Sequence, residues 1–105
     1  MKNISLLGST GSIGKQTLEV VAANPDKMKI RVLAAHTSDT ILEEQIRAVE
    51  PDFAVLTDKE AAARLQARYH GKTEILAGEE GLLAAATYSE VDTVLASMVG
   101  YAGLR

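Results

Sequence analysis

Short apolar runs alternate along this 105-residue chain with longer segments whose apolar positions recur every three or four residues. The short runs have the length and composition of buried strands, and the longer segments have the period of helices that pack one face on a sheet. The pattern predicts strands at about residues 3–7, 30–35, 53–56, 74–76 and 93–99. It predicts helices at about residues 12–23, 40–50, 57–69 and 79–88.

Local signals indicate where these helices begin and which face they bury. Two pairs have the spacing of capping boxes, Thr40 with Glu43 and Thr57 with Glu60. We expect them to start the second and third helices. Pro51 ends the second helix, because proline cannot continue the hydrogen-bonded ladder. The face of the first helix that is expected to pack on the sheet carries Ile13, Thr17, Leu18 and Val21.

Strands that alternate with helices are joined by parallel, right-handed crossovers. The predicted fold class is therefore α/β, a doubly wound, Rossmann-like and mostly parallel sheet with helices on both faces. With 47% hydrophobic residues, a chain of 105 residues can bury one core, so we expect residues 1–105 to form a single domain. Because such a sheet normally continues beyond this point, we expect an incomplete N-terminal domain that is truncated after the fifth strand.

Composition excludes several classes of partner. The net charge is −3 and no basic run is present, which argues against nucleic acid. The chain has no cysteine, so disulfides, thiolate metal sites and a cysteine nucleophile are excluded. No apolar stretch approaches the ~20 residues that span a bilayer. Since the first strand begins at the N-terminus without a leader, we expect no membrane association and a cytoplasmic location.

Three glycines at spacing three follow the first predicted strand and lead into the first helix. Gly8 allows a sharp turn, Gly11 lets the backbone approach a ligand, and Gly14 lets the helix pack close to the sheet. The first helical turn offers unpaired N–H groups and the positive end of the helix dipole to an anion. Hydroxyl groups of Ser9, Thr10 and Ser12, together with the backbone of Ile13, are expected around the same point. This arrangement is typical of a turn that binds the pyrophosphate of a dinucleotide.

The spacing of these glycines is GxxGxxG, whereas the familiar dinucleotide fingerprint is GxGxxG. An ordinary glycine-rich turn between a strand and a helix, without any ligand, is therefore the alternative interpretation. The preceding strand, the following helix and the N-terminal position favour the nucleotide site.

Three segments of the chain have the character of family motifs. The first is GSTGSIGKQTLEVV at residues 8–21, with Asn24 and Pro25 just beyond it. The second is EPDFAV at residues 50–55, and the third is ASMVGYAGL at residues 96–104. In this order they resemble the N-terminal portion of the 1-deoxy-D-xylulose 5-phosphate reductoisomerase family, in which the second motif leads into a strand. The resemblance therefore extends over essentially the whole chain.

The resemblance implies an enzyme that uses NADPH to convert 1-deoxy-D-xylulose 5-phosphate to 2-C-methyl-D-erythritol 4-phosphate in non-mevalonate isoprenoid biosynthesis. It implies that the segment around Met98 passes near the nicotinamide, with a plain glycine turn as the alternative. Family members bind a divalent cation, Mg²⁺ or Mn²⁺, through acidic residues further along the polypeptide, and the full-length protein is expected to be a homodimer. We therefore assign no catalytic residue and no metal ligand to this chain and expect it to be inactive alone.

The loop after the second strand is where a dinucleotide enzyme distinguishes NADP from NAD. An NAD site usually ends this strand with an acidic residue, but no acid precedes Asp39 here. The loop residues His36, Thr37 and Ser38 are therefore expected to bind the 2′-phosphate of NADPH. Many family members carry a basic residue in this loop, so its absence here weakens the expected selectivity. An exposed histidine without a ligand is the alternative for His36.

Two other functions remain open at this point. One is a different NAD(P)-dependent oxidoreductase or epimerase, which a Tyr-x-x-x-Lys motif would favour; this chain has none. The other is a non-catalytic nucleotide-binding module, which binding of NADPH would argue against.

Overall fold

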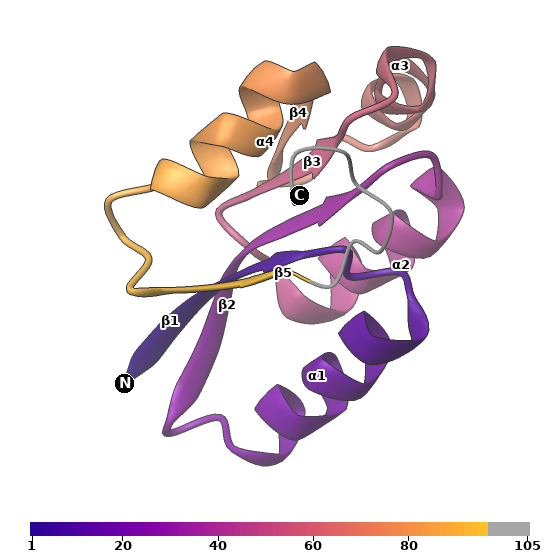
Figure 1. Cartoon of the computed structure of the whole chain (residues 1–105). Helices are drawn as coiled ribbons and strands as arrows, with labels where there is room; N and C mark the ends of the chain where they lie inside the picture. The colour runs from indigo at the N-terminus through magenta and orange to yellow at the C-terminus, as the bar shows by residue number, and fades with distance from the viewer. Residues whose placement is uncertain (97–105) are drawn as a thin grey trace.

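Five parallel strands form one sheet in the order β4-β3-β2-β1-β5 (Figure 1). The structure is a computed structural model, and it describes residues 1–96. The strands are β1 (Lys2–Leu7), β2 (Met28–Ala35), β3 (Phe53–Leu56), β4 (Glu74–Ala77) and β5 (Thr93–Ala96). The helices are α1 (Ser12–Ala23), α2 (Asp39–Val49), α3 (Lys59–Arg68) and α4 (Gly78–Thr87). The predicted α/β class with a parallel sheet is confirmed.

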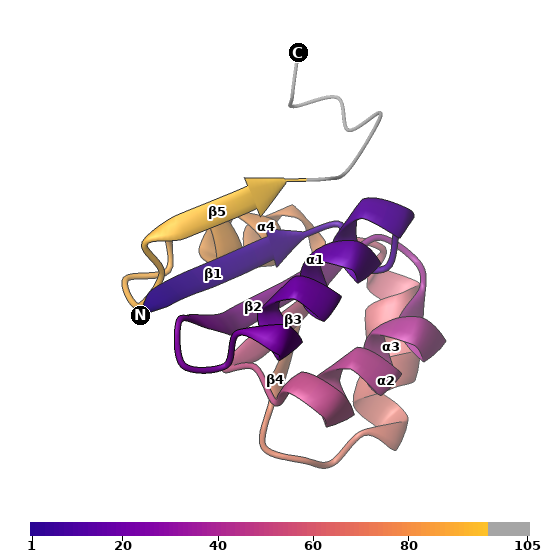
Figure 2. The same cartoon turned by 90° about the horizontal axis from the view of Figure 1, so that it is seen from below.

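The order of the strands fixes which helix covers which face. From β1 to β4 each strand is added beside the previous one, so α1, α2 and α3 cover the same face of the sheet (Figure 2). The chain then returns across the opposite face through α4 and adds β5 next to β1. The direction of strand addition therefore reverses between β1 and β5, which is the point where doubly wound sheets bind their ligands.

Two apolar cores lie on the two faces of this sheet. On the face of α1, α2 and α3, the residues Leu42, Ile46 and Leu65 are fully buried against β1 to β4. On the other face, Leu82 of α4 packs over β1, β2 and β3. Complete burial of a leucine or isoleucine contributes about 1.5–3 kcal/mol, so these helices are held chiefly by their apolar faces.

The helix starts differ from the capping boxes that the sequence suggested. Asp58, one residue beyond Thr57, caps α3 and accepts a hydrogen bond from the N–H of Ala61 at 3.0 Å. This shift is possible because aspartate caps helices at least as well as threonine. At the other predicted box, α2 begins at Asp39 and Glu43 binds arginines instead of the helix start.

The inward face of α1 also differs from the prediction. Ile13 is 57% exposed, whereas Gly14 and Val21 are buried. The cause is the very close approach of the first helical turn to the end of β1. A Cβ atom on Gly14 would lie 2.3 Å from the carbonyl oxygen of Gly8 and 2.7 Å from the Cα of Ser9. The backbone of Gly14 thus faces the sheet, and Ile13, about 100° round the helix, faces outward.

An ion-pair network joins the outer surfaces of α2 and α3. Arg68 reaches both Asp39, at 2.8 Å, and Glu43, at 2.6 Å. Arg64 also contacts Asp39, and Arg47 contacts Glu43. Hydrogen bonds from Arg68, followed by those from Arg64, lower the pKa of Asp39, and hydrogen bonds from Arg68 and Arg47 lower the pKa of Glu43.

The contact at Gly14 predicts unequal effects of alanine at two glycines of the turn. We expect Gly14→Ala to destabilise the fold by about 1–3 kcal/mol, because backbone atoms that cannot move aside occupy the place of the new methyl group. Gly11→Ala is the matched control, since its Cβ would lie 3.7 Å from the nearest atom, an ordinary contact. We expect it to cost less than about 1 kcal/mol. Urea denaturation measures both, and equal effects would contradict the packing argument.

The ion-pair network predicts how the effect of losing Arg68 depends on pH. Since the folded-state pKa values of Asp39 and Glu43 are lowered, their contribution is fully present above the unfolded values of about 4 and disappears as the pH falls through the folded values. Arg68→Met is therefore expected to lower stability at pH 7 and to have a diminishing effect toward pH 2. Lys27→Met, in the turn after α1, is the control. Urea midpoints measured between pH 7 and pH 2 check this, and a constant difference would contradict it.

Candidate functional site

The glycine turn and the loop after β2 lie at the same edge of the sheet. Leu7 pairs with Ala34 in the parallel register, so the two chains leave β1 and β2 side by side. The carbonyl oxygen of Ala34 accepts hydrogen bonds from the N–H groups of Gly8, at 2.7 Å, and Ser9, at 3.0 Å. The structure thus brings together the two segments, residues 8–14 and 36–38, that the sequence singled out.

Several backbone N–H groups of the glycine turn have no acceptor in the described part of the chain. Gly8 has a φ of 89°, a left-handed conformation that favours glycine. The N–H of Gly11 donates to the carbonyl oxygen of Gly8, at 3.3 Å. Within the described part of the chain, the backbone N–H groups of Thr10, Ser12, Ile13 and Gly14 form no hydrogen bond. These four donors lie in the turn and in the first residues of α1, at the positive end of the helix dipole, an arrangement that can hold an anion.

Gly11 is the residue that keeps this site open. An added Cβ would meet only the carbonyl oxygen of Gly8, at 3.7 Å, so nothing in the fold itself requires glycine there. A side chain at this position would instead occupy space beside the free N–H groups of Ser12 and Ile13. The turn therefore fits a phosphate or pyrophosphate group, because the donors are present and the approach to them is clear.

One expected donor of this turn points the wrong way. Ser9 is completely buried, so its hydroxyl group cannot reach an anion outside the turn, and that part of the prediction is wrong. The Oγ of Ser9 has no hydrogen-bond partner among residues 1–96. Thr10 is half-buried and Ser12 is exposed, so their hydroxyl groups remain accessible.

A side chain that no sequence motif indicates contacts the turn from another element. Gln45, in the middle of α2, donates from Nε2 to the carbonyl oxygen of Ser9 at 2.8 Å. The two residues are 36 positions apart, and no local motif relates a glutamine in a helix to a distant turn. The contact follows from the placement of α2 beside α1 and was not visible in the sequence.

The loop after β2 is exposed and is held by the loop after β3. His36 has its Nδ1 at 2.6 Å from the Oγ1 of Thr57, and its carbonyl oxygen accepts from the N–H of Asp58. Thr37 is exposed and Ser38 is half-buried, and Ser38 precedes α2 without a capping bond from its side chain. Polar groups of His36, Thr37 and Ser38 therefore lie at the surface near the start of α2.

Arginine side chains near this loop form ion pairs with Asp39, the first acidic residue that follows it. Asp39 is bound by Arg64 and Arg68, so its carboxylate does not stand alone next to Thr37 and Ser38. The network that holds it contains three arginines and two carboxylates, a formal charge of +3 − 2 = +1. This network thus adds no net negative charge beside the loop, which itself carries no lysine or arginine.

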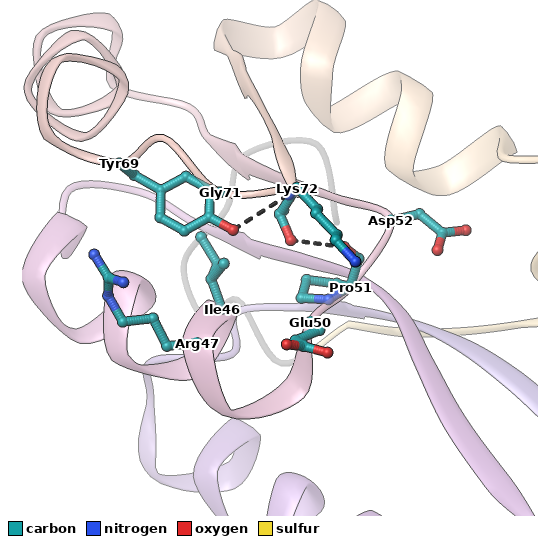
Figure 3. A pocket seen from close by; sticks show the side chains of 9 residues that line it. Ile46, Arg47, Glu50, Pro51, Asp52, Tyr69, Gly71 and Lys72 are labelled. Carbon is teal, nitrogen blue, oxygen red and sulfur yellow. Dashed lines mark hydrogen bonds between the residues drawn. The ribbon is translucent and has the colours of Figure 1, made fainter.

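A separate hollow of about 690 Å³ lies between the end of α2 and the connection from α3 to β4 (Figure 3). Some of its polar groups bind one another: Thr73 donates from its N–H to the Oη of Tyr69 and from Oγ1 to the carbonyl oxygen of Pro51. The guanidinium of Arg47 covers the ring of Tyr69, 5.4 Å from its centre. The hollow lies at the amino ends of β3 and β4, opposite the glycine turn, so it is not part of the candidate site.

Two further expectations concern residues or groups outside this edge. Met98 lies outside the described residues, as does the rest of the segment from residue 97 to residue 103. Within residues 1–96, no cluster of three or more His, Asp or Glu side chains is placed to hold a metal ion. Among the same residues, no helix has the length and apolar character needed to cross a membrane.

Comparison with known proteins relates this geometry to one family. The 1-deoxy-D-xylulose 5-phosphate reductoisomerases of Moorella thermoacetica and Geotalea daltonii are 49% and 47% identical to this chain over 105 residues, which is 99% of this chain and 27% of each relative. A crystal structure of DOX-P reductoisomerase in complex with NADPH, fosmidomycin and magnesium matches with a TM-score of 0.88 and 29% identity. That match covers 93% of this chain and 24% of the crystallised one.

This chain therefore spans about a quarter of the length of the proteins that it resembles. The family model of 1-deoxy-D-xylulose 5-phosphate reductoisomerase matches residues 4–105, nearly the whole chain. The sequence resemblance is confirmed, and the chain belongs to the 1-deoxy-D-xylulose 5-phosphate reductoisomerase family.

Proposed function

We propose that this chain is the NADPH-binding part of a 1-deoxy-D-xylulose 5-phosphate reductoisomerase. The observation that carries the proposal is the turn at the start of α1, where four backbone N–H groups have no partner among residues 1–96 and Gly11 leaves the approach to the turn open. The crystallised relative that binds NADPH supports the choice of cofactor. The proposed binding residues are Gly8, Thr10, Gly11, Ser12, Ile13, Gly14, His36, Thr37, Ser38 and Met98.

These residues divide the cofactor between two loops. The N–H groups of Thr10, Ser12 and Ile13 bind the pyrophosphate, whose charge is also stabilised by the dipole of α1. Gly8 shapes the turn through its positive φ, and Gly14 does so by allowing α1 to approach the end of β1 closely. This contact needs no metal and no basic side chain, because backbone N–H groups and the accessible hydroxyl groups of Thr10 and Ser12 supply the donors.

The second loop is proposed to select NADPH over NADH. Hydroxyl groups of Thr37 and Ser38 donate to the 2′-phosphate, and His36, oriented by Thr57, contacts the adenosine end. Asp39, which would otherwise repel that phosphate, is offset by Arg64 and Arg68.

Reduction by hydride transfer is the chemistry that NADPH supplies when bound. The role of this chain is to hold and orient the cofactor at the edge of the sheet where strand addition reverses. We assign catalytic residues, the Mg²⁺ or Mn²⁺ site and substrate recognition to the parts of the relatives that this chain does not span. Met98 is proposed to lie near the nicotinamide. Homodimer formation and a cytoplasmic location complete the proposal.

The pyrophosphate assignment predicts that a branched side chain at position 11 blocks binding. We expect Gly11→Val to weaken NADPH binding by at least about 30-fold, because the side chain occupies the space that the phosphate needs. Calorimetric titration of the folded variant measures the loss, with Gly11→Ala as an intermediate case and circular dichroism as the check on folding. An unchanged affinity of folded Gly11→Val for NADPH would contradict the assignment of the pyrophosphate to this turn.

The assignment of the second loop predicts a change in cofactor preference. The unmodified chain is expected to bind NADPH more tightly than NADH. Thr37→Asp is expected to reverse this order, because a carboxylate repels the 2′-phosphate and accepts hydrogen bonds from a ribose hydroxyl. Thr37→Ser, which keeps the hydroxyl, is the control. Titration of all three proteins with both cofactors provides the test, and equal affinity of the unmodified chain for the two would show that the loop does not discriminate.

A further inference from the structure

Gln45 connects the middle of α2 to the glycine turn through a half-buried hydrogen bond. Its Nε2 lies 2.8 Å from the carbonyl oxygen of Ser9. We propose that Gln45 is a positioning residue for the pyrophosphate, an inference that rests on the proposed function. It acts by fixing the orientation of the peptide group between Ser9 and Thr10.

The geometry of a peptide group links this contact to the ligand. In a trans peptide, the C=O of one residue and the N–H of the next point in opposite directions. All peptide bonds in the described part of the chain are trans. Since Gln45 holds the oxygen of Ser9 toward α2, the N–H of Thr10 points away from α2. That N–H is one of the donors of the turn that have no partner among residues 1–96.

Neighbouring peptide groups of the turn are held by the main chain itself. The carbonyl oxygen of Ala34 accepts from the N–H groups of both Gly8 and Ser9. The N–H of Gly11 donates to the carbonyl oxygen of Gly8. The peptide between Ser9 and Thr10 has no such main-chain bond within residues 1–96. The buried hydroxyl of Ser9 does not hold it either. Gln45 therefore supplies the restraint that the backbone of the turn lacks.

Stability alone does not explain a glutamine at this position. The side-chain amide of Gln45 must point its Nε2 at the carbonyl oxygen of Ser9, because the reverse orientation would place Oε1 against that oxygen. The Oε1 atom is then left buried without a hydrogen-bond partner among the described residues. A buried acceptor without a partner offsets much of what the hydrogen bond contributes to folding. A role in aiming the N–H of Thr10 accounts for a contact that adds little to stability.

Methionine provides the decisive substitution, because it matches the length of glutamine and has no donor. A matched control exists in Gln66, which donates from Nε2 to the carbonyl oxygen of Ile75 at 2.9 Å, also in a half-buried setting. That contact joins α3 to β4, away from the turn. We expect Gln45→Met to weaken NADPH binding about tenfold and Gln66→Met to leave it within about twofold.

Two measurements on the 105-residue chain separate positioning from stability. Calorimetry gives the affinity for NADPH. Nuclear magnetic resonance of the ligand-free protein gives the carbonyl ¹³C shift of Ser9 and the amide ¹H shift of Thr10. Gln45→Met is expected to change both shifts, and Gln66→Met neither. If the methionine variant does not fold, Gln45→Glu keeps the shape, replaces the donor by an oxygen and is expected to weaken binding at least as much.

Each result of these measurements either supports or contradicts the positioning role of Gln45. An unchanged Ser9 carbonyl shift in Gln45→Met, or equal losses of affinity in the two methionine variants, overturns the positioning role. Failure of the unmodified chain to bind NADPH contradicts the proposed function and removes the basis of the inference. That result is seen without any variant, so the two failures are distinguishable.

Discussion

The close contact between the first turn of α1 and the end of β1 governs the rest of the site. It exists only because Gly14 has no side chain: the backbone atoms of Gly8 and Ser9 occupy the place where a Cβ would lie. This contact sets the rotation of α1, which turns Val21 inward and Ile13 outward. The same rotation leaves the free N–H groups of the first turn at the edge of the sheet, where a ligand can reach them. The packing of α1 on the sheet and the accessibility of these N–H groups thus both depend on the absence of a side chain at Gly14.

Much of the fold follows from local signals, and the sequence predicts it well. Strand β3, Phe53–Leu56, has its predicted bounds because four consecutive apolar residues are buried on both faces of the sheet. Helix α1 has its predicted bounds because glycines precede it and Asn24 caps its end. The start of α3 differs from the predicted one because the adjacent residues Thr57 and Asp58 are both good caps, and Asp58 is the one that caps the helix. Such local competition is decided by tertiary contacts, here the pairing of Thr57 with His36.

The candidate site is predictable only in part, for the same physical reason. Spacing of the glycines locates the turn, because each glycine answers a local backbone requirement. The inward orientation of Ser9 and its bond to Gln45 depend on how α2 lies against the turn, 36 residues away in the chain. Likewise, Arg68 meets Asp39 across 29 residues. Contacts between residues so far apart in the chain have no sequence motif of their own. The contacts of Gln45 and Arg68 were therefore not predicted, whereas the glycines that form the turn were.

Helix α2 links the two loops that are proposed to hold the cofactor. At its first residue, Asp39 is tied to α3 by Arg64 and Arg68; two turns further on, Gln45 is tied to the glycine turn. Leu42 and Ile46, fully buried, fix the same helix on the sheet. Because a close-packed interior transmits strain, a displacement of α2 would move the loop of residues 36–38 and the Ser9 peptide together. The geometry of the two loops that are proposed to hold the cofactor therefore depends on one element, and a substitution that moves α2 is expected to affect both loops.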